Sequence, residues 1–186
     1  MGKVDRSTKK GTDIHMNKSA DISKKVAGTG VFIALAMIFS YIEALIPIHL
    51  GIWGVKLGIA NLVVVTSLYL LPLSWVWLIS LVRIFLIGLL FGNGLTMLYS
   101  FAGGILSLIV MSILKKIKGF SITGVSIAGG VSHNVGQLLM AVVILGNVNI
   151  AYYLPLLLVA GLITGALIGL ASVKILKAAK KVISYI

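Results

Sequence analysis

The sequence predicts an all-α integral membrane protein built as a bundle of six transmembrane helices. Hydrophobic residues make up 59% of the 186 residues, whereas charged residues make up only 11%. A soluble domain carries roughly 25% charged residues, because polar side chains must cover its surface. The apolar residues also fall into runs long enough to cross a bilayer. The composition therefore excludes a soluble globular domain, and the absence of cysteine excludes a disulfide scaffold.

Each expected span is an apolar run that ends at a helix breaker or at lysines. About 20 apolar residues cross the hydrocarbon layer, with a range of about 17–25. The second and third runs are short, so the division between them is the least marked. In order, the runs are 26–46 before Pro47, 55–71 before Pro72, 75–91 before Gly92, 95–114 before Lys115, 120–145 before Gly146 and 152–173 before Lys174.

Lysine and arginine residues gather on one side of this predicted bundle. Residues 1–25 hold seven of them, the loop 115–118 holds three and the segment 174–181 holds four. The loops 92–94 and 146–151 on the other side hold none. Loops rich in Lys and Arg remain in the cytosol. We therefore expect a multi-pass protein of the bacterial cytoplasmic membrane with both termini in the cytosol.

This topology divides the chain into three parts. Residues 1–25 are expected to form a disordered basic tail, residues 26–175 the transmembrane domain and residues 176–186 a short basic tail. The net charge of +12 does not indicate a nucleic-acid partner. The cations lie at the ends of apolar runs rather than on a polar face interleaved with aromatic residues. The bilayer itself is the first expected partner.

Small residues recur every fourth position in three of the runs. Such stripes let helices approach closely, either within the bundle or against a partner membrane protein. The sequence does not decide which stripe serves which purpose. The stripes are Gly30 and Ala34 in the first run, Gly124, Ala128, Ser132 and Gly136 in the fifth, and Gly161, Gly165 and Gly169 in the sixth.

Seven polar residues lie in or beside the spans without a packing reason. An ionisable side chain inside a span costs at least about 2.5–3.5 kcal/mol, so it faces a cavity, a partner or an interface. Most of the seven fall in the outer half of the bundle, which predicts a pocket that opens outward. The residues are Glu43, Lys56, Asn61, Arg83, His133, Asn134 and Gln137.

The charges in this set favour an anionic or carboxylate-bearing ligand, because an arginine such as Arg83 binds carboxylates in a bidentate manner. Structural roles remain open for the same residues. Lys56 can extend to the outer interface, and Glu43 can pair with Lys56 or Arg83. Interhelical hydrogen bonds are the structural alternative for the polar residues of the fifth run.

No pattern in the sequence indicates catalysis. The chain lacks cysteine, and its three histidines do not have the spacing of a metal site. The membrane domain holds a single acid, Glu43, whereas general acid–base catalysis by carboxylates needs two. No P-loop is present, so ATP hydrolysis by that route is excluded. We expect no catalytic residues, no metal and no cofactor.

Four segments resemble the Gx transporter family, which is also labelled heptaprenyl diphosphate synthase component I. The resemblance covers about residues 28–175, and its segments GVKLGIAN and AGGVSHNVGQ are fairly specific. The segments are SYIEALIPIHLGIWGVKLGIANLVVV (40–65), VRIFLIGLLFGN (82–93), LYSFAGGILSLIVM (98–111) and FSITGVSIAGGVSHNVGQLLMA (120–141).

The family in turn looks like the substrate-binding S components of energy-coupling-factor (ECF) transporters. That similarity implies six helices, cytosolic termini and a vitamin-like ligand bound in the outer half. It also implies a transmembrane coupling subunit with ATPases as partners. In such S components a small-residue stripe on the first helix docks the coupling subunit. Gly30 and Ala34 match this stripe, with glycine in place of the usual first alanine.

Three functions follow as hypotheses. The first is a membrane substrate-binding or transport subunit for a small, anionic, vitamin-like or isoprenoid-related solute. The alternative is a non-transporting membrane partner in isoprenoid or quinone biosynthesis or in flavin-based extracellular electron transfer, with redox or isoprenoid-pathway proteins as its partners. The third is a membrane enzyme acting on a prenyl lipid. Prenyl diphosphate synthases bind Mg²⁺-diphosphate through DDxxD motifs, and this chain has none. We therefore expect that it is not an enzyme.

Overall fold

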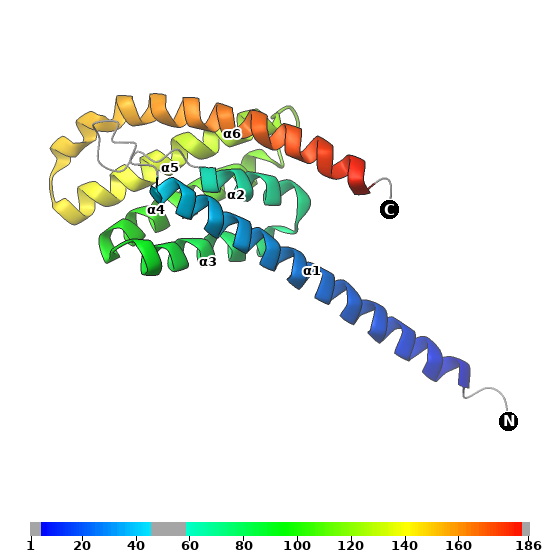
Figure 1. Cartoon of the computed structure of the whole chain (residues 1–186). Coiled ribbons are helices and arrows are strands. Elements are labelled where there is room, and N and C mark those ends of the chain that lie inside the picture. Colours follow the sequence, from blue (N-terminus) through cyan, green and yellow to red (C-terminus); the bar gives the residue numbers. More distant parts are fainter. Residues whose placement is uncertain (1–4, 46–58, 184–186) are drawn as a thin grey trace.

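A computed structural model describes residues 5–45 and 59–183 of the chain. These residues form six α-helices and one short 3-10 helix, and they contain no β-strand (Figure 1). The expectation of an all-α protein is confirmed. In chain order the elements are α1 (Asp5–Leu45), α2 (Ile59–Leu70), α3 (Leu73–Phe91), α4 (Gly94–Leu114), α5 (Ile122–Leu145), η1 (Val148–Tyr153) and α6 (Leu154–Ile183).

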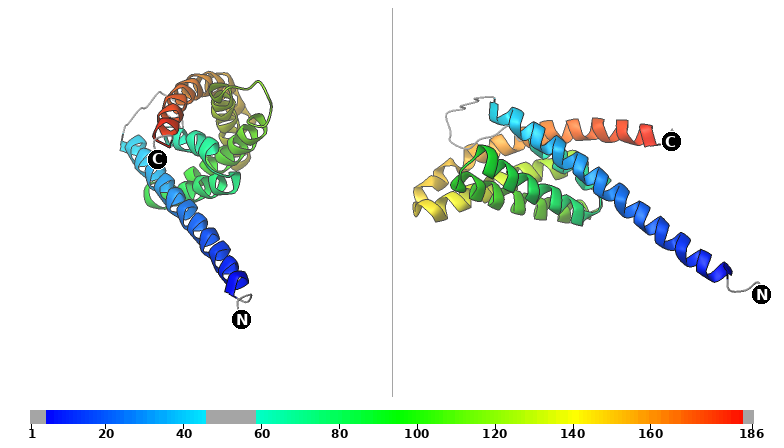
Figure 2. Two further views of the ribbon diagram at one scale, coloured as in Figure 1. Left: turned by 90° about the vertical axis from the view of Figure 1, so that its right-hand side faces the viewer. Right: turned by 60° about the horizontal axis from the view of Figure 1, so that its bottom comes forward.

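The six α-helices close a ring in which each helix packs on a neighbour at either side. The order around the ring is α1, α2, α6, α5, α4 and α3, and α3 packs back on α1. The view along the bundle in Figure 2 shows this arrangement. The pairs α5–α6 and α4–α5 share the most extensive contacts. A ring of helices leaves space for a cavity along its axis, provided that the side chains do not fill it.

Local sequence signals explain where several helices begin and end. At the start of α4, the Thr96 N–H donates to Asn93 Oδ1 at 2.8 Å, and the Asn93 N–H donates to Thr96 Oγ1 at 2.9 Å. This reciprocal pair is a capping box, which satisfies two otherwise unpaired donors. The hydroxyl of Ser121 caps α5 by accepting from the Gly124 N–H at 3.0 Å. Gly146 ends α5 in the left-handed conformation, with φ of 59°.

Five helices in the described residues are long and apolar enough to cross a membrane. The corresponding segments are Ile22–Ile42, Leu73–Phe91, Gly94–Lys116, Ile122–Leu145 and Val148–Ala179, and Ala60–Leu70 is a shorter apolar helix. A membrane bundle is therefore confirmed, whereas the sixth span is not. The expected second span, 55–71, is described only from Ile59 onward, because residues 46–58 lie outside the described part of the chain.

Two helices extend further than the sequence predicts. The first helix, α1, is continuous from Asp5 to Leu45 and so includes residues 5–25, which precede the first predicted span. Likewise α6 continues to Ile183, beyond the predicted end at residue 173 and through most of the expected tail 176–186. A helix that is already nucleated in the membrane extends at little cost, and Lys, Ala and Leu are good helix formers.

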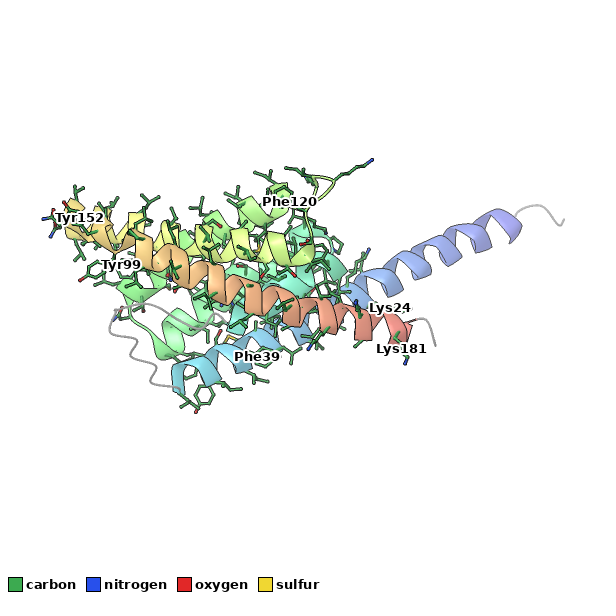
Figure 3. The ribbon with its side chains drawn as sticks, turned by 90° about the horizontal axis from the view of Figure 1, so that it is seen from above. Lys24, Phe39, Tyr99, Phe120, Tyr152 and Lys181 are labelled. Atoms are coloured by element: carbon green, nitrogen blue, oxygen red, sulfur yellow. The ribbon has the colours of Figure 1, made fainter. Side chains whose placement is uncertain are left out.

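The two ends of the bundle hold different segments of the chain. The start of α1, the end of α6 and the α2–α3 and α4–α5 connections lie at one end, whereas the α3–α4 connection and η1 lie at the opposite end (Figure 1). Figure 3 places Lys24 and Lys181 at the first end, and Tyr99 and Tyr152 toward the other. We call the first of these ends the lysine-rich end. Among the residues whose side chains the structure describes, its lysines are Lys24, Lys25, Lys115, Lys116, Lys118, Lys174, Lys177 and Lys181.

The tightest core of the bundle lies in the half next to the lysine-rich end. Its members come from the middle and end of α2, the last two turns of α4 and the first turn of both α3 and α5. Each is at most 2% exposed. Packed apolar side chains therefore close the ring on this side. The cluster consists of Val64, Val65, Leu68, Val76, Leu108, Met111 and Val125.

The glycines of α6 pack against α5. A Cβ atom added at Gly165 would lie 2.7 Å from the Ile127 Cα, and one at Gly161 would lie 2.9 Å from the Gly130 carbonyl oxygen. This stripe serves packing within the bundle. The predicted stripe on α5 is different: Gly136 faces Ala102 of α4, whereas Gly124 contacts its own cap at Ser121. The small residues of α5 serve both of its neighbours: Gly129 contacts Met111 of α4, and Gly130 contacts Gly161 of α6.

Candidate functional site

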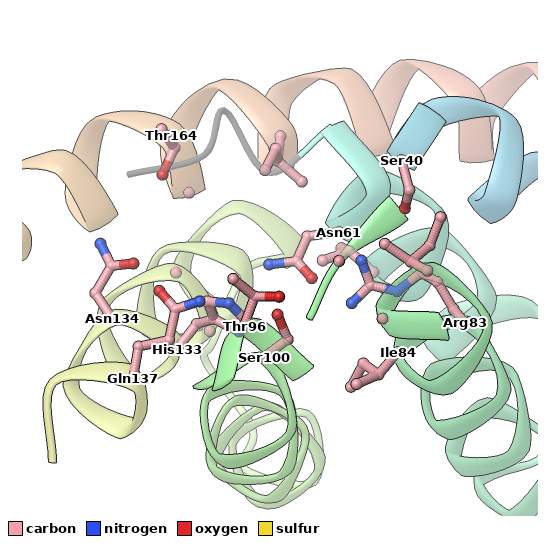
Figure 4. A pocket seen from close by; sticks show the side chains of 18 of the residues that line it. Ser40, Asn61, Arg83, Ile84, Thr96, Ser100, His133, Asn134, Gln137 and Thr164 are labelled. Atoms are coloured by element: carbon pink, nitrogen blue, oxygen red, sulfur yellow. The ribbon is translucent and has the colours of Figure 1, made fainter. Parts of the chain in front are cut away.

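A cavity of about 490 Å³ lies inside the ring, and all six α-helices contribute to its lining (Figure 4). Its lining includes glycines and aliphatic side chains together with many hydrogen-bonding groups. Such a mixture of apolar walls and a few convergent polar groups is typical of ligand pockets. The polar lining residues are Ser40, Asn61, Arg83, Asn93, Thr96, Ser100, Ser126, His133, Asn134, Gln137 and Thr164.

The cavity is closed toward the lysine-rich end by an apolar floor, formed by Val65, Met111 and Ile168. Val65 and Met111 belong to the tight core, and Ile168 packs against it. Ser126 also lines the cavity near this floor, but its hydroxyl donates to the Gly165 carbonyl oxygen at 2.8 Å. The deep part of the cavity is therefore predominantly apolar.

Hydrogen-bonding side chains surround the middle of the cavity and the half away from the lysine-rich end. Arg83 lies eight residues before Phe91, the last residue of α3, which is about 12 Å along the helix axis. Figure 4 shows its guanidinium group directed toward Asn61 of α2. Thr96 and Ser100 point into the cavity from α4, and His133 and Gln137 approach from α5.

Ser40 adds a buried hydroxyl to the α1 wall of the cavity. The residue is only 7% exposed, and its Oγ has no hydrogen-bond partner among the described residues. Burying a hydroxyl without a partner costs free energy. A polar ligand or a water molecule inside the cavity would remove this cost. The buried Ser40 hydroxyl therefore supports the presence of a polar ligand or a water molecule in the cavity.

The α5 wall depends on close contact with α4 and α6. A Cβ atom at Gly103 would lie 2.7 Å from the His133 carbonyl oxygen and 2.8 Å from the Gln137 Cγ. Glycine at this position lets α4 approach the segment of α5 that holds both side chains. On the other side, Asn134 Nδ2 donates to the Leu157 carbonyl oxygen of α6 at 2.7 Å. Asn134 therefore has a structural role as well as a place in the lining.

The structure brings five of the seven predicted site residues together around the cavity: Asn61, Arg83, His133, Asn134 and Gln137. Glu43 lies near the C-terminal end of α1, and its side chain is not described. Lys56 lies outside the described residues.

The predicted docking stripe lies elsewhere on the molecule. Gly30 and Ala34 are exposed on α1, and a Cβ atom at Gly30 would meet nothing within 4 Å. Neither residue lines the cavity.

Sequence reasoning missed five hydroxyl residues of the lining: Ser40, Thr96, Ser100, Ser126 and Thr164. A serine or threonine in an apolar run gives little signal, because its hydroxyl can bond to its own helix. Thr164 does so, donating to the Ala160 carbonyl oxygen at 2.9 Å. One signal was available: Thr96 completes the capping box after the Gly92-Asn93 turn, and Ser100 lies one turn further along the same face.

The charged and metal-binding groups of the site are few. Among the described lining residues, Arg83 is the one with a permanent formal charge. Over residues 5–45 and 59–183, no three His, Asp or Glu side chains come close enough to hold a metal ion. The arrangement offers hydrogen-bond donors and acceptors around a polar or anionic group, above an apolar floor.

Comparison with known proteins gives one match. A family model described as heptaprenyl diphosphate synthase component I matches residues 32–175. No curated protein and no solved structure matches the chain. The matched segment contains every residue that lines the cavity, from Ser40 to Ile168. The basic first part of α1 lies outside it.

Proposed function

We propose that this chain is a membrane subunit which binds a small solute inside its ring of helices. The chain belongs to the heptaprenyl diphosphate synthase component I family. One observation carries the proposal: side chains with no place in a lipid environment converge from all six helices on one cavity. Polar and ionisable residues inside a membrane domain are costly and generally serve a function. Holding a solute is the function that this arrangement supports best.

The lining also supports a class of solute. Arg83 supplies a guanidinium group, which recognises carboxylate and phosphate groups in a bidentate manner. The amides of Asn61 and Gln137 add further donors and acceptors to the lining. Below them, the floor of Val65, Met111 and Ile168 accepts an apolar part. We propose a small solute with an anionic group and an apolar part, vitamin-like or isoprenoid-related.

We propose that the cavity faces the outside of the bacterial cytoplasmic membrane. The positive-inside rule assigns the lysine-rich end, and with it both termini, to the cytosol. The tight core lies next to that end, so the closed side of the cavity would face the cytosol. In this orientation a solute enters from outside and rests above the floor, in the manner of the S components of ECF transporters.

Import past the floor would require energy from a partner. The sequence has no P-loop, and we propose that the chain performs no chemical reaction itself. The matching family is named as a component of a synthase, which supports a role within a larger assembly. The exposed face of α1 around Gly30 and Ala34 is where we would place a coupling subunit.

Native mass spectrometry of the gently solubilised full chain tests this function. We expect the intact protein to carry a small molecule that survives solubilisation and is released when the gas-phase complex is activated. Partner subunits that remain bound would appear in the same spectrum. A protein that carries only lipid and detergent, after purification from cells grown in rich medium, would contradict solute binding.

A further inference from the structure

The C-terminal end of α2 lacks one of its own hydrogen-bond donors. In an α-helix the carbonyl of residue i accepts from the N–H of residue i+4. For Leu68 this residue is Pro72, which has no N–H. The preceding bond is made, since the Leu71 N–H donates to the Ser67 carbonyl oxygen at 2.8 Å. Leu68 therefore needs a donor from elsewhere in the fold.

Lys115 of the α4 C-cap supplies that donor. Its Nζ donates a hydrogen bond to the Leu68 carbonyl oxygen. The same ammonium group lies 5.3 Å from the centroid of the Tyr69 ring, within cation–π distance. One positive charge thus lies at the C-terminal ends of α2 and α4, where helix dipoles favour a cation. The bond connects residues that are 47 positions apart in the sequence.

The same short helix also contributes to the cavity. Asn61 and Val65 line it, and Val65 forms part of the floor. Together with Val64 and Leu68, Val65 also belongs to the tight core. With 12 residues, α2 is the shortest of the described α-helices. The position of this short helix therefore decides both where the Asn61 amide lies and whether the floor is closed.

We propose that Lys115 is a positioning residue for the cavity and acts through α2. While its ammonium group holds Leu68 and Tyr69, α2 stays in the ring and presents Asn61 and Val65 to the solute. When Lys115 releases them, α2 becomes free to move, the floor opens and the hold on the solute weakens. Lys115 is exposed at the lysine-rich end, so this contact can be reached from that side of the membrane. The effect on a solute rests on the proposed function, whereas the effect on α2 does not.

Hydrogen–deuterium exchange of the full chain in lipid nanodiscs tests the proposal. Three variants are compared with the wild type: Lys115→Met, Lys115→Arg and Lys116→Met. Methionine keeps the length of the side chain and removes its charge and donors, whereas arginine restores both. Lys116→Met is the matched control, because Lys116 is the exposed neighbour on the same turn. The first readout is amide exchange in peptides from α2, with peptides from α5 and α6 as internal references.

We expect Lys115→Met to speed exchange in α2 about tenfold, the change that follows from losing one charge-assisted hydrogen bond. Exchange in α5 and α6 should stay the same, and Lys115→Arg and Lys116→Met should resemble the wild type. Unchanged exchange in α2 would overturn the proposal. An equal increase in all helices would also overturn it, since Lys115 would then support the whole fold rather than position α2.

The second readout separates this proposal from the proposed function. It is the amount of small molecule retained by each purified variant, measured by native mass spectrometry. We expect Lys115→Met to retain severalfold less than the wild type and Lys115→Arg to retain a similar amount. If α2 loosens but retention does not fall, the link to the cavity is wrong. If the wild type itself retains nothing, the solute-binding function fails, and the exchange result still decides the role of Lys115 in holding α2.

Discussion

The side-chain amide of Asn134 donates a hydrogen bond of 2.7 Å to the backbone carbonyl oxygen of Leu157, joining α5 to α6. Asn134 also lines the cavity, and Figure 4 shows its amide oxygen on the cavity side. The structural and the ligand-binding interpretations of this residue are therefore compatible. Its amide nitrogen holds the wall together, and its oxygen remains available as an acceptor.

Replacing this donor should destabilise the α5–α6 pair. In Asn134→Asp the amide nitrogen becomes a carboxylate oxygen that faces the Leu157 carbonyl oxygen. We expect a loss of about 1–3 kcal/mol of unfolding free energy, the cost of leaving partly buried polar groups unsatisfied. The measurement is thermal unfolding in detergent, followed by tryptophan fluorescence. Asn149→Asp makes the same chemical change at an exposed position near the end of the bundle and should leave the melting temperature unchanged. Equal melting temperatures for all three proteins would contradict the importance of this bond.

The contact between α5 and α6 should tolerate no added methyl group at Gly130. A Cβ atom there would lie 2.6 Å from the Gly161 carbonyl oxygen, which is backbone and cannot move aside easily. We expect Gly130→Ala to destabilise the protein by about 1–3 kcal/mol, as overpacking does. Gly28→Ala is the matched control, because a Cβ atom at Gly28 meets nothing within 4 Å. In an open helical position, alanine should stabilise by about 0.5–1 kcal/mol. Similar melting temperatures for the two variants would contradict the packing described.

The direction in which the cavity opens can be tested with single cysteines, because the chain has none of its own. Ser100 lines the cavity, whereas Ser112 lies near the lysine-rich end of α4 and is 9% exposed. We expect Ser100→Cys to react with a membrane-impermeant maleimide added outside intact cells, and Ser112→Cys to remain unmodified. Labelling of Ser100→Cys only after the cells are opened would reverse the proposed orientation.

Composition and breakers predicted the helices well because both act locally. The apolar run 75–91 is α3 (Leu73–Phe91) in the structure. An apolar run of this length that ends at Gly92 has few possible structures other than a helix that stops at the glycine. Helix ends beyond the membrane were harder to predict. The lysines after residue 173 indicate an interface, but they do not stop a helix, and α6 continues to Ile183.

The site was only partly accessible to the same reasoning. Arg83 and His133 attract attention because lipid rejects ionisable groups. Ser100 carries no such signal, because a hydroxyl in an apolar helix costs little. The contact between Lys115 and Leu68 was not predictable either, as it joins positions 47 residues apart. Only the ring of helices brings those positions together.

The most direct test of the solute-binding cavity is the small-molecule content of an Arg83→Gln variant. Glutamine keeps a polar side chain at this position and removes the charge and the bidentate donors. Lys177→Gln removes one positive charge at an exposed position and is the matched control. Wild type, variant and control are purified in parallel, and the molecules they release are quantified by mass spectrometry. We expect an anionic solute that is about 10- to 100-fold less abundant in Arg83→Gln and unchanged in Lys177→Gln. Equal amounts in all three proteins would contradict a solute held by Arg83.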